Sequence, residues 1–107
     1  MSNWTAVCDL NDLTPNTGLC ALVEGRQVAI FRQGSERLFA VGNFDPIGGA
    51  NVLSRGLLAQ LGDNITVASP LYKQHYRLTD GQCLEDENVR IPVYRVRLEG
   101  SRVQVAL

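Results

Sequence analysis

Histidine and lysine are almost missing from this sequence, which has one of each, His75 and Lys73. A single histidine excludes every site that needs two imidazole groups from one chain. Cysteine is scarce as well: Cys8, Cys20 and Cys83 are the only three, and no two have C-x-x-C spacing. An odd count argues against a closed disulfide framework, and the spacing gives little support to a metal site. We expect small apolar residues in or beside strands, with Cys83 the best candidate for a regulatory thiol.

Long apolar runs are absent too. Stretches such as residues 28–31 span a few residues, whereas a membrane-spanning helix needs about 20. The N-terminal segment MSNWTAVCDL has no basic part followed by an apolar part, so we expect no secretory signal. The net charge of -1 gives no electrostatic support to phosphate binding. These absences predict a cytoplasmic protein with reduced thiols that binds neither membranes nor nucleic acids.

What the sequence does have is a series of short apolar stretches separated by turn residues about every 8–12 residues, which is typical of an all-β sandwich or barrel. We expect one domain, residues 1–107, with little helix. The closing hairpin is clearest, because apolar residues alternate with arginines that face solvent or a partner. Strands are expected at 19–23, 27–32, 37–41, 64–68, 74–78 (paired near residue 83), 94–98 and 103–107, and helical turns at 9–13 and 54–61.

Two segments break the strand pattern, residues 42–50 (GNFDPIGGA) and 68–74 (ASPLYKQ). Their glycine and proline content predicts loops, and loops on a rigid scaffold commonly carry function. Asp45, Ser69, Tyr72 and His75 could form an oxygen and nitrogen metal site there, but this is a poor ligand set at neutral pH. Asp45 before a proline is otherwise a turn residue. Ser69 near His75 could suggest a nucleophile, although no orienting acid or oxyanion hole is evident.

Two further motifs have simpler interpretations. Gly48-Gly49 lacks the surrounding glycine fingerprint and the long helix of a phosphate-binding loop, so we interpret it as a turn. The acidic run at residues 85–87 is typical of a solvated loop.

The segments LFAVGN, FDPIGGANVLSRG, ITVASP, SPLYKQHYRLTDGQCLED and YRVRLEGSRVQVAL together resemble the Rieske iron–sulfur fold, over nearly the whole chain. The resemblance implies a Rieske-like sandwich or barrel of antiparallel strands with two long loops at one tip. A Rieske domain carries C-x-H in the first loop and C-x-x-H in the second, with the two cysteines on one iron and the two histidines on the other. Here these positions are occupied by Asp45, Ile47, Ser69 and Tyr72. We therefore expect no cofactor or metal in this chain.

A Rieske-like chain without these ligands resembles the small subunit of the NADH-dependent, sirohaem-containing assimilatory nitrite reductase. The Asp-Pro loop, the VLSRG segment and the SPLYKQ stretch are similar to that family. The resemblance implies a cytoplasmic accessory subunit that is not catalytic alone. Its large partner subunit would carry FAD, a [4Fe–4S] cluster and sirohaem, and reduce nitrite to ammonium. Two alternatives remain: a Rieske-type [2Fe–2S] electron-transfer ferredoxin, and an unrelated protein-binding β module.

Ile47, Leu71, Tyr72 and Lys73 are the candidate partner-binding residues, because they would lie at the tip where ferredoxins present their ligand histidines. Apolar and aromatic side chains are enriched in interface cores. For Ile47, inward packing into the volume of the missing cluster is an equal alternative. For Tyr72 we favour the rim of a binding patch, since its hydroxyl group needs a polar partner.

Overall fold

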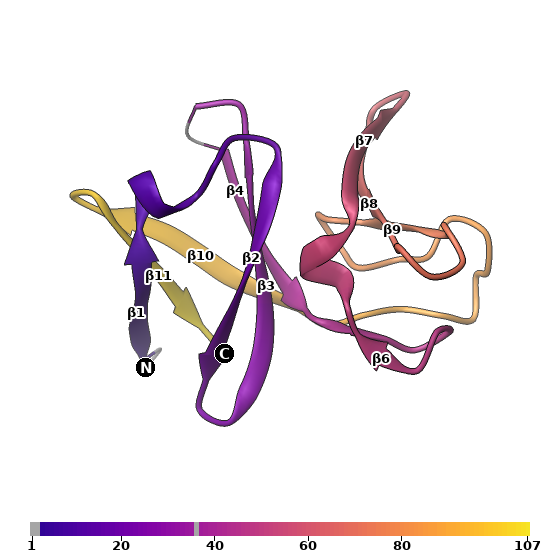
Figure 1. Ribbon diagram of the computed structural model, residues 1–107, viewed down its shortest axis with the longest axis horizontal. Helices are drawn as coiled ribbons and strands as arrows, with labels where there is room; N and C mark the ends of the chain where they lie inside the picture. Colours follow the sequence, from indigo (N-terminus) through magenta and orange to yellow (C-terminus); the bar gives the residue numbers. More distant parts are fainter. Residues whose placement is uncertain (1–2, 36) are drawn as a thin grey trace.

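The computed structural model describes residues 3–35 and 37–107, which form two β lobes lying side by side (Figure 1). The larger lobe is an antiparallel sheet in the order β1-β11-β10-β4-β3-β2. Its edge strands β1 and β2 contact each other, so the sheet is nearly closed into a barrel. The strands are β1 (Trp4–Asp9), β2 (Thr17–Val23), β3 (Arg26–Gln33), β4 (Arg37–Gly42), β10 (Val93–Glu99) and β11 (Arg102–Ala106).

The smaller lobe is inserted between β4 and β10, which are neighbours in the large sheet. It holds an antiparallel sheet of β7 (Leu57–Leu61), β8 (Asn64–Ala68) and β9 (His75–Arg77), and a short ribbon of β5 (Phe44–Asp45) and β6 (Ala50–Asn51). Both loops singled out in the sequence belong to this lobe, whereas the chain ends lie in the other lobe (Figure 1). The prediction of an all-β fold with little helix is confirmed.

Strand β3 is the wall that the two lobes share. Val28 and Ile30 belong to the core inside the barrel, whereas Ala29 and Phe31 belong to a second core beneath the smaller lobe. All four side chains are fully buried, because successive residues of a strand point to opposite faces and both faces are covered. This arrangement explains the continuous apolar run at residues 28–31. It also fixes the smaller lobe rigidly against the larger one.

Two turns follow their local chemistry. Glu24 and Gly25 join β2 to β3 with φ values of 50° and 78°, and two positive values in a row are the signature of a type I′ hairpin turn. Gly81 has φ 82° and lies in the turn that returns the chain from β9 to a bridge between Tyr76 and Cys83. Both predicted pairings are therefore confirmed.

The prediction was wrong over residues 54–61 and missed β1. The helical turn there is only η2 (Leu53–Arg55), and Leu57–Leu61 is β7, because its backbone pairs with β8 over its whole length. Gly56 permits this pairing, since a Cβ atom there would collide with the carbonyl group of Ala68. The other turn, η1 (Leu10–Asp12), lies within 9–13 as predicted. In the part of the chain that is described, neither helical segment is long and apolar enough to cross a membrane.

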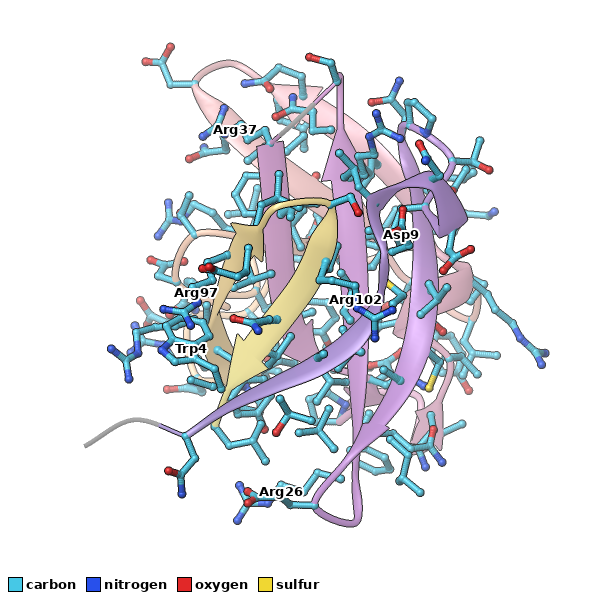
Figure 2. The ribbon with its side chains drawn as sticks, turned by 90° about the vertical axis from the view of Figure 1, so that its left-hand side faces the viewer. Trp4, Asp9, Arg26, Arg37, Arg97 and Arg102 are labelled. Atoms are coloured by element: carbon cyan, nitrogen blue, oxygen red, sulfur yellow. The ribbon has the colours of Figure 1, made fainter. Side chains whose placement is uncertain are left out.

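The arginines of the closing hairpin lie on the outer face of β10, as the alternation predicts. Trp4 on β1 covers two of them, with the guanidinium carbon of Arg97 4.2 Å and that of Arg95 5.4 Å from the ring centroid. Figure 2 shows Trp4 and Arg97 side by side on this face. Cation–π contacts at such exposed sites stabilise by about 0.5–1 kcal/mol each. They attach the first strand to the last hairpin.

Candidate functional site

Two loops meet at one end of the smaller lobe and form a surface that we call the tip. Loop 1, residues 42–50, leaves β4 and contains β5, and loop 2, residues 69–74, joins β8 to β9. They touch through their side chains: Ser69 Oγ donates a hydrogen bond of 2.5 Å to Asp45 Oδ2. These two residues hold the cysteine positions of the Rieske pattern, so the same two points of the loops that a cluster would join are joined by a hydrogen bond.

Asp45 is fully buried, and its carboxylate is the centre of the tip. Besides Ser69, it accepts hydrogen bonds from Tyr76 Oη and Gln74 Nε2, each at 2.8 Å, and from the backbone amide of Ile47 at 3.0 Å. The donors come from loop 1, loop 2 and β9. A buried charge is tolerated only when such donors surround it. The carboxylate therefore binds three segments of the chain together.

Asp45 remains a carboxylate because its hydrogen bonds outweigh its burial. Burial is the largest single influence and acts to raise the pKa of this group, but the hydroxyl groups of Ser69 and Tyr76 and the amides of Gly48 and Ile47 lower it, and the net pKa lies below the usual value. The pKa of Tyr76 is strongly raised, first by burial and then by the nearby carboxylate. Tyr76 therefore stays a neutral donor to an ionised acceptor.

Backbone hydrogen bonds fix the shape of both loops. In loop 1 the amide of Gly49 donates to Asp45 O at 2.7 Å. In loop 2 the amide of Lys73 donates to Ser69 O at 3.0 Å and that of Leu71 to Ser69 Oγ at 3.2 Å. Gly48 is required here, because a Cβ atom on it would lie 2.8 Å from Asp45 Oδ2 and overlap the side chain of Leu71.

The predicted partner-binding residues lie on the outside of this network. The exposed fractions are 41% for Ile47, 45% for Leu71 and 70% for Tyr72, and Lys73 is exposed as well. Ile47 does not pack inward, and the interior of the tip is filled by Asp45, Ser69, Gln74 and Tyr76 instead. An apolar and aromatic surface is consequently presented to solvent at the end of the smaller lobe.

The residues present do not fit a Rieske cluster. Ile47 has no donor atom, Tyr72 points into solvent, and Ser69 donates its proton to Asp45. His75 lies on β9 and its Nδ1 is 2.7 Å from Glu85 Oε2. Over the described residues no group of three histidine, cysteine, aspartate or glutamate side chains converges. The alternative oxygen and nitrogen site is thus not assembled: only Asp45 and Ser69 come together, and they bind each other.

Two other sequence-based candidates were wrong. Ser69 and His75 do not form a nucleophile and base, because Ser69 Oγ is bound to Asp45 and the imidazole to Glu85. Cys83 is 2% exposed within the second core, so it is not an accessible regulatory thiol. Cys8 is also buried, and burial raises the pKa of its thiol, whereas Cys20 is exposed; all three thiols are free.

Sequence reasoning missed Gln74 and Tyr76 as site residues. Gln74 Nε2 donates to both Asp45 and Tyr76 Oη, the latter at 3.2 Å, and this completes the network on the side of β9. The available signal was the segment QHYR itself, where two long polar residues two positions apart on a strand share one face. Both point inward, toward the acid of the other loop.

Comparisons with known proteins agree with this geometry. The sequence profile of the Rieske-like [2Fe-2S] domain family matches residues 3–106. The nitrite reductase (NADH) small subunit of Salmonella typhimurium is 48% identical over 106 residues, which cover 98% of each chain. The solved structure of the Escherichia coli protein NirD is 45% identical, with a TM-score of 0.92, covering 100% of this chain and 98% of that one.

A third relative has a different architecture. The nitrite reductase [NAD(P)H] large subunit of Klebsiella oxytoca is 40% identical over 102 residues, which are 95% of this chain but only 11% of that protein. A domain similar to this chain is therefore built into a much longer polypeptide there.

Replacing Asp45 by asparagine should destabilise the fold strongly. The amide group introduced by Asp45→Asn would point a donor at Ser69, Gln74 or Tyr76, all of which are donors to this position. We expect the free energy of unfolding to fall by about 3 kcal/mol, measured by urea titration. Asp63→Asn, the same chemical change at an exposed residue of the β7–β8 turn, is the control and should change it by less than about 0.5 kcal/mol. Equal effects of the two changes would contradict the central role of Asp45.

Acid should remove the same stabilisation. Because folding lowers the pKa of Asp45, the folded state favours the ionised form more than the unfolded state does. Its contribution is complete above the unfolded value of about 3.9 and is lost as the pH falls through the lower folded value. We expect the unfolding free energy of the wild type to fall more steeply below about pH 4 than that of Asp45→Asn. Parallel pH profiles of the two proteins would disprove this assignment.

Proposed function

Because this chain belongs to the family of nitrite reductase (NADH) small subunits, within the Rieske-like domain family, we propose that it is the non-catalytic accessory subunit of a cytoplasmic NADH-dependent nitrite reductase. Its partner is the large subunit, which by family resemblance carries FAD, a [4Fe–4S] cluster and sirohaem and reduces nitrite to ammonium. The small subunit binds the large one and raises its activity, and it carries no redox centre of its own.

The observation that carries this proposal is the Asp45 network. In a redox-active Rieske domain the two loops are joined by a cluster, whereas here Ser69, Gln74 and Tyr76 hold them around a carboxylate. The loops are kept in place, while the exposed ligand positions carry Ile47 and Tyr72. A scaffold that keeps its docking surface without a metal-binding donor set is suited to binding and poorly suited to electron transfer.

The relative from Klebsiella oxytoca supports the identity of the partner. A domain similar to this chain forms part of the large-subunit polypeptide in that organism, so such a domain works next to the large subunit. The geometry of the chain ends is compatible with such a connection: Trp4 pairs with Ala106, and both ends lie in the lobe that does not carry the tip (Figure 1). A connection at the chain ends therefore leaves the tip free.

We assign the docking surface to the tip, with Ile47, Leu71 and Tyr72 as apolar contacts and Lys73 beside them. Leu71 packs against Gly48, which lies directly over the Asp45 carboxylate. The exposed residues therefore stand on a rigid base, and little conformational entropy is lost when they bind. Tyrosine is among the residues that contribute most to interfaces.

The small subunit should increase NADH oxidation by the large subunit in the presence of nitrite. Tyr72→Ala removes an exposed ring and should weaken binding to the large subunit by about 10- to 30-fold, as expected for an interface hot spot. Leu22→Ala is the control, because Leu22 is 72% exposed on β2 in the other lobe. Binding is measured by titration calorimetry and activity by the loss of NADH absorbance. A Tyr72→Ala protein that binds and activates like the wild type would exclude the tip as the docking surface.

The purified chain should be colourless. We expect no visible absorption bands and less than about 0.1 iron per chain by elemental analysis, because only two of the four ligand positions carry buried donor atoms and these bind each other. Stoichiometric iron with visible bands would establish the ferredoxin alternative instead. A colourless protein that neither binds nor activates the large subunit would favour the unrelated protein-binding module.

A further inference from the structure

A pocket of about 470 Å³ opens beside the tip, between the end of η2 and loop 2. We call it the side pocket. Its walls are mostly apolar and include Leu57, Ala68 and Pro70, while Arg55, Lys73 and His75 bring nitrogen groups to its rim. Leu57 is 77% exposed, which is unusual for a leucine in a protein of this size. The side pocket therefore combines an uncovered apolar wall with a basic edge.

The positive charge at this edge is not neutralised within the described chain. Its two ion pairs are His75 with Glu85 and Arg77 with Asp80, so neither involves Arg55 or Lys73. Glu85 is the nearby carboxylate, and it is occupied by the backbone amide and the ring of His75, each at 2.7 Å. Over residues 3–35 and 37–107, the side chains of Arg55 and Lys73 make no hydrogen bond either. Two cations beside an apolar pocket favour a carboxylate group as the occupant.

Lys73 is held in an uncommon backbone conformation. Its φ is 62°, in the left-handed region that costs about 1–2 kcal/mol for a residue with a side chain. The turn is secured by the bond from Lys73 N to Ser69 O, and Ser69 is anchored to Asp45. The network at the centre of the tip thus fixes the position from which the lysine side chain reaches the rim of the side pocket. Strained residues held in this way cluster at binding sites.

We propose that the side pocket receives an aspartate or glutamate side chain of the large subunit, whose carboxylate binds Arg55 and Lys73 while Leu57 and Pro70 cover its apolar stem. This inference rests on the proposed function and names the chemistry of the partner surface. Lys73 belongs both to the tip and to the side pocket, so the two surfaces are continuous. The tip supplies apolar contact area, and the side pocket sets the register by charge.

A small free anion fits these observations less well. Nitrite is far smaller than about 470 Å³, and it would leave the apolar wall of Leu57 and Pro70 wet. An acidic side chain on a protein surface fills the volume, covers that wall and brings the charge. Free nitrite at this position is therefore a competing outcome that the experiment separates.

The single lysine of the chain makes the test sharp. A carbodiimide joins an amine to a carboxylate with no spacer, and the small subunit offers only Lys73 and its N-terminal amine. We expect treatment of the complex to give a peptide, found by mass spectrometry, in which Lys73 is joined to an aspartate or glutamate of the large subunit. Lys73→Arg is the matched control: it keeps the charge, so binding should stay within about threefold, but this cross-link should disappear.

Charge reversal tests the pocket independently of cross-linking. Arg55→Glu should weaken binding to the large subunit at least about 30-fold and reduce its salt dependence, as expected when a buried interfacial charge pair is broken. Lys73→Glu should do the same. Arg102→Glu makes the same charge change on β11 in the other lobe and should alter affinity by less than about threefold. Thermal unfolding of each isolated variant verifies that it folds.

The outcomes are distinguishable. If the wild-type chain does not bind the large subunit, the proposed function fails and the side-pocket proposal fails with it. If it binds, but Arg55→Glu and Lys73→Glu behave like Arg102→Glu and no Lys73 cross-link forms, only the side-pocket proposal is overturned. Sodium nitrite is titrated into the isolated chain against sodium chloride at equal ionic strength, with backbone amide shifts as the readout. Saturable shifts confined to residues 55–57 and 68–75 would assign the pocket to a free anion and overturn the proposal.

Discussion

A carboxylate with no exposed surface needs donors on every side, and this requirement at Asp45 decides the structure of the tip. The donors lie on loop 1, on loop 2 and on β9, so all three segments must converge on one point. The polar groups occupy the interior of the tip, and the large apolar side chains of the loops are consequently turned outward. The exposed surface of Ile47, Leu71 and Tyr72 is thus the counterpart of a buried charge.

Much of the fold could be predicted from the sequence, because its strong signals are local. The closing hairpin, the Glu24-Gly25 turn and the Asp80-Gly81 turn each depend on alternation or on positive φ within a few residues. Strands β1 and β7 could not be found in this way. β1 pairs with the last strand of the chain, and β7 exists because β8 pairs with it beside Gly56. Pairing partners distant in sequence override weak local preferences.

The candidate site could be predicted in place but not in mechanism. The resemblance to the Rieske pattern identified Asp45, Ile47, Ser69 and Tyr72 and both loops. An aspartate before proline has the same local pattern in an exposed turn as in a buried network, so the central role of Asp45 was not visible. Gln74 and Tyr76 act by meeting a residue about 30 positions earlier, for which a single sequence carries no signal. The residues of the side pocket, likewise, come together only when η2 lies against loop 2.

The junction between the loops also has a biosynthetic consequence. A metal-linked pair of loops cannot close until iron and sulfide have been delivered and inserted, and until then the chain waits in an incomplete state. The bonds among Asp45, Ser69, Gln74 and Tyr76 use only atoms that leave the ribosome with the polypeptide. The tip is therefore finished as soon as the chain has folded, and its supply follows translation alone, even when a cell is short of iron.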